Sequence, residues 1–195
     1  MFSVAPRLSE LLITDVLWDG YSPQLSIPWT QIRRYRGVFK SSQQLNILRQ
    51  SANLVECSIG FDDVTTTHGN IMVVLPLLRR LCVEGSNILD HFTAPALEDL
   101  VVPTVAPSLV YFVQRSSCHL RTFVINQGSS AAGLVDLLEA CPSLTHLVLS
   151  FGGLPSPELG DITPLFTALH ATDSVASTVE FRSIRMSRVT ADFWK

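Results

Sequence analysis

The 195-residue chain is 47% hydrophobic and only 16% charged, a composition that excludes a disordered protein. Its formal net charge of −3 provides no basic field for nucleic acid or an anionic membrane, so we expect neither as a partner. The longest nearly unbroken apolar stretch, residues 71–78, contains Pro76 and is too short to span a bilayer.

One pattern of apolar residues returns along the whole chain. In its first copy, Leu8, Leu11 and Ile13 occupy the first, fourth and sixth positions. The first positions of the eight copies are Leu8, Ile32, Leu54, Leu78, Leu97, Leu120, Leu144 and Phe181. Neighbouring first positions are 19 to 24 residues apart as far as Leu144, and the last interval is 37 residues. A period of about 20–29 residues is typical of leucine-rich repeats.

The fourth to sixth positions of each copy alternate between apolar and other residues, which predicts a short strand with one inward face. Proline precedes the first apolar position by two residues in four copies, at Pro6, Pro76, Pro95 and Pro142. Because proline disfavours helix at the residue before it and lacks an amide donor, it is suited to the junction that leads into a strand.

Helices are predicted in some of the return segments between strands. Residues 42–50 and 130–140 have apolar side chains at helical spacing, and residues 161–170 begin with Asp161 as an N-cap candidate. Residues 65–70 and 102–107 are predicted to be loops or single turns. One strand cannot bury its apolar face alone, whereas stacked repeats can form a continuous core.

These patterns predict an α/β protein built as a leucine-rich-repeat solenoid. A curved parallel sheet would form its concave side, and helices and loops its convex side. We expect residues 1–195 to form a single array of about seven to eight irregular repeats.

Three segments show the repeat most fully: Pro6-Arg7-Leu8-x-x-Leu11, Ile27-Pro28-Trp29-Thr30-Gln31-Ile32-Arg33-Arg34-Tyr35 and Cys141-Pro142-Ser143-Leu144-x-x-Leu147-x-Leu149. They resemble the leucine-rich repeats of F-box-like proteins from mushroom-forming fungi. The resemblance implies the substrate-recognition repeats of a ubiquitin-ligase component. Two departures accompany it: we expect no F-box, because the chain opens inside a repeat, and the asparagine of the repeat consensus is replaced in every copy. A ubiquitin-ligase adaptor is therefore expected as a partner only if an F-box lies upstream.

Motifs that carry chemistry are missing from the sequence. Neither of the glycine-rich phosphate loops occurs, and the five histidines show no metal-binding spacing. The four cysteines, Cys57, Cys82, Cys118 and Cys141, are scattered, which favours reduced thiols in an intracellular protein of the cytoplasm or nucleus. We expect no catalytic residue, no metal, no cofactor and no enzymatic activity.

Two acidic pairs and one basic cluster are further candidate sites. Asp62-Asp63 and Glu98-Asp99 lack a third group fixed nearby, so an acid/base role is not favoured. Arg34 and Arg36 are predicted to project from the sheet on the side away from the core. They fit either a solvated strand face or a patch that recognises an anion or carboxylate, for which the planar guanidinium is suited.

The repeat pattern also predicts which residues face the concave side. The candidate protein-binding residues on that face are Glu10, Arg34, Arg36, Glu56, Arg80, Glu84, Asp99, Asn126 and His146. The preferred hypothesis is a protein–protein interaction module that binds an unknown protein substrate for an F-box-type ubiquitin ligase. The alternative is a truncated or degenerate repeat protein with only a structural or scaffolding role.

Overall fold

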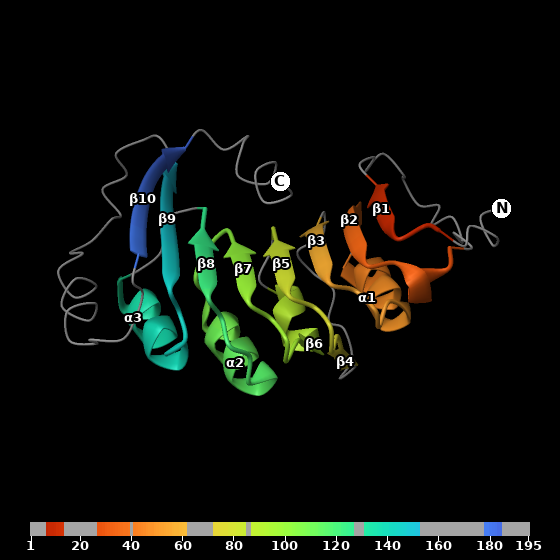
Figure 1. Cartoon of the computed structure of the whole chain (residues 1–195). Coiled ribbons are helices and arrows are strands. Elements are labelled where there is room, and N and C mark those ends of the chain that lie inside the picture. The colour runs from red at the N-terminus through yellow and green to blue at the C-terminus, as the bar shows by residue number, and fades with distance from the viewer. Residues whose placement is uncertain are drawn as a thin grey trace.

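The computed structural model describes residues 7–13, 27–39, 41–61, 72–84, 87–126, 131–152 and 178–184. Within these residues, the main feature is a sheet of eight parallel strands arranged in chain order (Figure 1). These strands are β1 (Glu10–Ile13), β2 (Arg34–Phe39), β3 (Glu56–Phe61), β5 (Arg80–Val83), β7 (Asp99–Val102), β8 (Thr122–Ile125), β9 (His146–Gly152) and β10 (Thr178–Ile184). The expectation of an α/β protein with a parallel sheet is confirmed.

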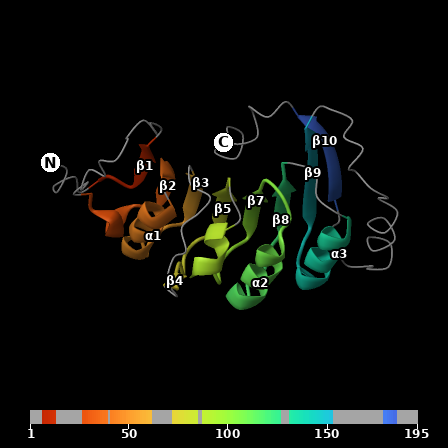
Figure 2. The same cartoon turned by 180° about the vertical axis from the view of Figure 1, so that it is seen from behind.

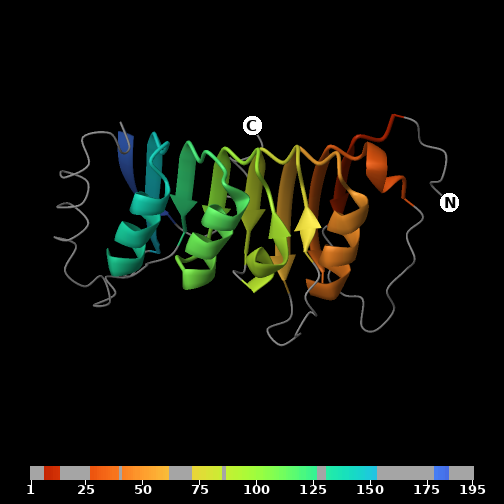
Figure 3. The same ribbon diagram turned by 90° about the horizontal axis from the view of Figure 1, so that it is seen from below.

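The helices of the described residues lie on one face of this sheet (Figures 1 and 2). They are α1 (Ser41–Gln50), α2 (Pro107–Ser116) and α3 (Ala131–Ala140), with 3₁₀ turns at Trp29–Gln31 and Asn87–His91. A small parallel pair, β4 (Val73–Val74) and β6 (Phe92–Thr93), lies on the same side. Figure 3 shows the helices as a row beside the row of strands. We call the other face of the sheet, over which no described helix lies, the open face.

The strands pair in an unbroken register, so equivalent positions of successive strands lie side by side. The row that points toward the helices runs Leu11, Tyr35, Cys57, Leu81, Leu100, Phe123 and Leu147. From Tyr35 to Leu147, each of these side chains is at most 1% exposed. The first positions of the same copies, from Ile32 to Leu144, are equally buried. Both sets belong to one hydrophobic core.

A tight turn precedes several of the strands. The amides of Leu54, Leu78, Leu97 and Leu144 each donate a hydrogen bond of 3.1 to 3.3 Å to the carbonyl three residues earlier. Pro76, Pro95 and Pro142 occupy the second position of these turns, where their fixed φ matches the turn geometry. The predicted role of proline before a strand is confirmed at these three positions, and Pro6 lies outside the described residues.

A repeated hydrogen-bond pattern fixes the start of each strand against its predecessor. The carbonyls that accept two amide hydrogens from the following strand belong to Ser9, Arg33, Val55, Arg79, Glu98 and Arg121. These donor–acceptor distances are 2.7 to 3.1 Å. Because both amides of each pair meet one oxygen, a slip of the strand by one residue would break both bonds and turn its side chains to the wrong face.

The eighth copy of the apolar pattern was placed wrongly. The sequence pattern makes Phe181 a first position and Ile184 a fourth, but β10 pairs Val179 with Leu147 and Phe181 with Leu149. Phe181 therefore corresponds to a sixth position. The 37-residue interval before this copy removes the regular spacing that sets the frame of the other copies.

Two predicted helices are confirmed and one helix was missed. Residues 42–50 and 130–140 correspond to α1 and α3, whereas residues 65–70 and 161–170 lie outside the described residues. The missed helix α2 begins at Pro107 and buries Leu109, Phe112 and Val113. Its C-cap is Ser117, whose φ of 50° is left-handed.

Candidate functional site

The most regular feature of the open face is a row of charged side chains at the start of the strands. The register places Glu10 beside Arg34, Arg34 beside Glu56, Glu56 beside Arg80 and Arg80 beside Asp99. We call these five residues the charged row. The sign of the charge alternates from strand to strand, and adjacent strands lie about 4.8 Å apart. Arg34, Glu56 and Arg80 therefore each have an opposite charge on either side.

Four ion pairs connect the charged row. Arg34 lies 4.0 Å from Glu10 and 3.3 Å from Glu56. Arg80 lies 3.6 Å from Glu56 and 3.2 Å from Asp99. Glu56 therefore bridges both arginines, and its side chain is only 12% exposed. Most charges of the row are therefore paired within the row, and few remain to bind a partner.

Arg36 differs from the arginines of the charged row. It lies two residues beyond Arg34 on β2, in a second row with Leu12, Ser58 and Cys82. Arg36 is partly exposed and makes no ion pair with any described residue. Leu12 beside it is 59% exposed. The predicted arginine cluster is thus divided: Arg34 is paired within the sheet, and Arg36 is available to a ligand.

The second row becomes small and apolar toward the middle of the sheet. Ser58, Cys82 and Val101 follow one another there and are 3%, 2% and 1% exposed. Burial, with a smaller contribution from Glu84, raises the pKa of the Cys82 thiol to about 11, against opposing effects of its hydrogen bond with Ser58 and of Arg36. The thiol is therefore neutral at physiological pH.

Two predicted residues, Glu84 and Asn126, lie just beyond the strand ends. Their amides donate to the carbonyls of Ile59 and Val102, which continues the ladder into a third row. The Glu84 carboxylate lies above Gly60, where an added Cβ would be 2.7 Å from Oε2. The Oδ1 atom of Asn126 is buried and has no hydrogen-bond partner in the described structure.

Toward the C-terminal strands, other polar residues take the place of the acidic and arginine side chains of the charged row. Thr122 follows Asp99, and His146 follows Thr122. His146 is exposed, and its Nδ1 lies 3.0 Å from the Thr145 hydroxyl. The register thus distributes the nine candidate residues over three neighbouring rows of one face, with charges concentrated on β1 to β7.

The described residues contain no group of three or more metal-ligating side chains. Burial raises the pKa of the Cys57 thiol, and it raises the pKa of Cys118 to about 11 and of Cys141 to about 12. None of these thiols is an activated thiolate at neutral pH. No described helix combines the length and apolar character needed to cross a membrane.

Two features of the structure were missed by the sequence patterns. Helix α2 and the groove beside it were not foreseen, although Leu109, Phe112, Val113 and Ser116 have the spacing of a helix face. The buried Gln44 was also missed, because a glutamine in a weakly apolar helix gives no signal of its partners. The chain matches no protein-family model, and comparisons with curated proteins and with solved structures give no significant match.

Proposed function

We propose that the chain is a protein-binding module of the leucine-rich-repeat type, and that the open face is its binding surface. The observation that carries the proposal is the unbroken register, which aligns side chains of successive strands in rows on a face free of described helices. Arg34, Arg80 and His146 are exposed there, whereas the middle of the second row is buried. The repeat period of 19 to 24 residues supports a solenoid, whose curvature would make this face concave.

The chemistry of the open face favours a partner that offers a carboxylate beside an apolar group. Arg36 has no ion pair among the described residues, and the exposed Leu12 adjoins it. Arginine is enriched at the energetically dominant positions of interfaces, and its planar guanidinium matches a carboxylate. The charged row would border this contact and orient the partner through its alternating potential.

Within this proposal, the partner is the substrate of an F-box-type ubiquitin ligase. The support is the resemblance of the repeats to those of fungal F-box-like proteins, carried by segments such as Pro142-Ser143-Leu144-x-x-Leu147. Contact with the ligase adaptor would require an F-box upstream of these repeats. The competing function is structural, a scaffold without a bound substrate, and it is distinguished by the experiment below.

Affinity capture with matched charge reversals tests the binding surface. The wild-type chain, Arg36→Glu on the open face and Arg49→Glu on α1 would be used as baits; Arg49 is an exposed arginine on the helix side. Partners should be captured by the wild type and by Arg49→Glu and lost with Arg36→Glu, while circular dichroism shows all three baits folded. Equal capture by the two variants would contradict binding through Arg36, and no specific capture at all would favour the scaffold.

The ubiquitin-ligase assignment has a separate test. For a partner captured through Arg36, removal of this chain from cells should raise the partner's abundance and lower its ubiquitin conjugates. If the partner's level and conjugation stay unchanged, the module binds proteins but the ubiquitin-ligase assignment is wrong.

A further inference from the structure

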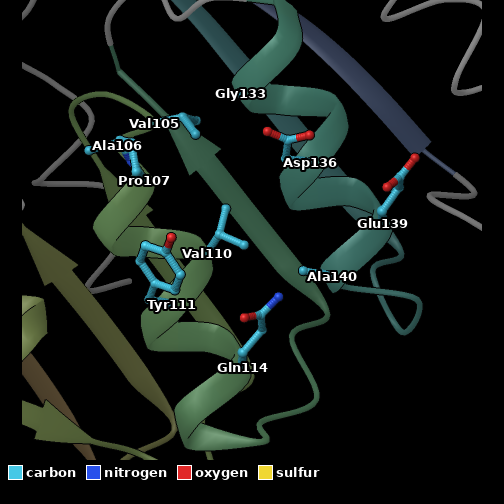
Figure 4. Close-up of a pocket in the computed structure, with 10 residues that line it drawn as sticks. All are labelled: Val105, Ala106, Pro107, Val110, Tyr111, Gln114, Gly133, Asp136, Glu139 and Ala140. Carbon is cyan, nitrogen blue, oxygen red and sulfur yellow. The ribbon is translucent and has the colours of Figure 1, made fainter.

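A groove lies between α2 and α3 on the helix side of the sheet, away from the open face (Figure 4). Its volume is about 630 Å³. The residues that line it are Val105, Ala106, Pro107, Val110, Tyr111, Gln114, Gly133, Asp136, Glu139 and Ala140. A space of this size can receive one or two side chains of a ligand.

The lining combines apolar side chains with acidic ones and contains no basic residue. Val110, Pro107 and Ala140 provide an apolar surface, while Asp136 and Glu139 contribute two carboxylates. Figure 4 shows the Asp136 carboxylate on the side of α3 toward α2, and that of Glu139 further from α2. Neither carboxylate forms an ion pair with a described residue. Negative charge at this groove is therefore uncompensated by the described part of the chain.

Tyr111 gives the groove an aromatic wall. It projects from α2 and is 63% exposed, the highest value among the large hydrophobic residues exposed in the described structure. Its ring lies on the opposite wall from Asp136, which comes from α3. An aromatic face and a carboxylate both attract an organic cation, the first through its π electrons and the second through its charge.

We propose that this groove binds a peptide segment of a partner protein that presents a lysine or arginine beside an apolar side chain. The cation meets Asp136 and the face of Tyr111, and the apolar side chain packs against Val110 and Ala140. Charge complementarity selects this occupant, because an acidic or neutral peptide would leave Asp136 desolvated without a partner. The site lies on the other face from the binding surface proposed above and does not depend on it.

Peptide selection on the intact chain tests the groove. A random dodecapeptide library displayed on phage would be selected on the immobilised full chain, and enriched peptides would be synthesised with a fluorescein label for anisotropy measurements. We expect enriched peptides that place lysine or arginine next to an apolar residue. Their affinity should fall at least tenfold with Asp136→Asn and three- to tenfold with Tyr111→Ala, and should weaken as the salt concentration rises.

Two controls test whether peptide affinity depends on the groove itself, and not on the overall charge of the protein or on the open face. Asp90→Asn removes the same charge from another exposed aspartate and should leave the affinity within twofold. Arg36→Glu should also leave it unchanged. The proposal is overturned if no peptide is enriched, if the enriched peptides lack a cation, or if their binding survives Asp136→Asn. Concentration-dependent dimerisation that Tyr111→Ala abolishes would overturn it too, because the occupant would then be a second copy of the chain.

Discussion

The hydroxyl group of Tyr35 lies in the space that a side chain at residue 37 would occupy, and residue 37 is glycine. Tyr35 and Gly37 hold the fourth and sixth positions of the second repeat, where other repeats carry pairs such as Leu81 and Val83. One large ring thus fills the volume of two aliphatic side chains. The Tyr35 and Trp29 rings pack edge to face, with their centroids 5.8 Å apart. In the second repeat, a large residue and a glycine therefore replace the two aliphatic residues that other repeats place in the core.

Gly37→Ala should destabilise the fold because its Cβ would collide with the Tyr35 hydroxyl and approach Cζ to 2.7 Å. Since the ring is buried on all sides, we expect a loss of about 1–3 kcal/mol in the free energy of unfolding, measured by urea denaturation. The double variant Tyr35→Leu/Gly37→Val, which restores the usual pair, should recover part of this loss. Additive effects of the two changes would show that the residues are not coupled.

The buried Gln44 completes this substitution. Its Oε1 accepts the Tyr35 hydroxyl at 3.1 Å, and its Nε2 donates to the carbonyls of Gly37 at 3.0 Å and Gly60 at 3.4 Å. Gln44→Leu would remove these three hydrogen bonds and leave the buried Tyr35 hydroxyl without its acceptor, so we expect the free energy of unfolding to fall by about 1–3 kcal/mol. Gln50→Leu is the matched control, since Gln50 lies at the exposed end of the same helix and should change stability by less than about 0.5 kcal/mol. Equal effects of the two variants would contradict the role of Gln44.

The parts of the fold visible in the sequence are those set by local periodicity. The fourth and sixth positions from Leu11 to Leu149 could be predicted because inward side chains must be apolar on every strand. The last strand could not, because a 37-residue interval removes the regular spacing, and apolar residues at both Val179 and Ile184 allow two frames. Only the pairing with Leu147 and Leu149 decides between them.

For the open face, the sequence predicts which residues point outward but not which of them are already paired. Arg34 and Arg36 look equivalent in the sequence, since both alternate with Tyr35. Their difference arises across strands, because Glu10 and Glu56 lie beside Arg34, whereas Leu12 and Ser58 lie beside Arg36. Such pairing depends on register between repeats more than twenty residues apart. The α2–α3 groove was missed for the same reason, since it is formed by two helices from different repeats.

Glu56→Gln should show that the charged row acts as a network. Glu56 forms ion pairs with both Arg34 and Arg80 and is nearly buried, so its replacement leaves these two cations on either side of a neutral side chain. We expect the free energy of unfolding to fall by about 1–2 kcal/mol at low salt, and by less in 1 M NaCl, where the repulsion is screened. Glu10→Gln at the exposed end of the row should cost less than about 0.5 kcal/mol. A salt-independent loss for Glu56→Gln would point to packing instead.

The buried thiols predict how stability changes at alkaline pH. In the folded chain, burial raises the pKa of Cys82 from its ordinary value of 9.0 to about 11, and that of Cys141 to about 12. Below pH 9 both folded and unfolded chains keep these protons, so the thiols cause no pH dependence there. Between pH 9 and 11 the unfolded chain loses them first and is favoured, so the free energy of unfolding should fall as the pH rises.

Urea denaturation from pH 7 to 11 measures this decline, and the variants Cys82→Ala and Cys141→Ala identify its source. Each variant should show a shallower decline than the wild type, whatever its stability at pH 7, because one group whose pKa differs between the two states has been removed. In the folded wild type, iodoacetamide at pH 7.5 should leave both thiols unmodified, since neither is a thiolate at that pH. Rapid alkylation of Cys82 would contradict its burial on the open face. Declines of equal slope in all three proteins would contradict a raised pKa of either thiol.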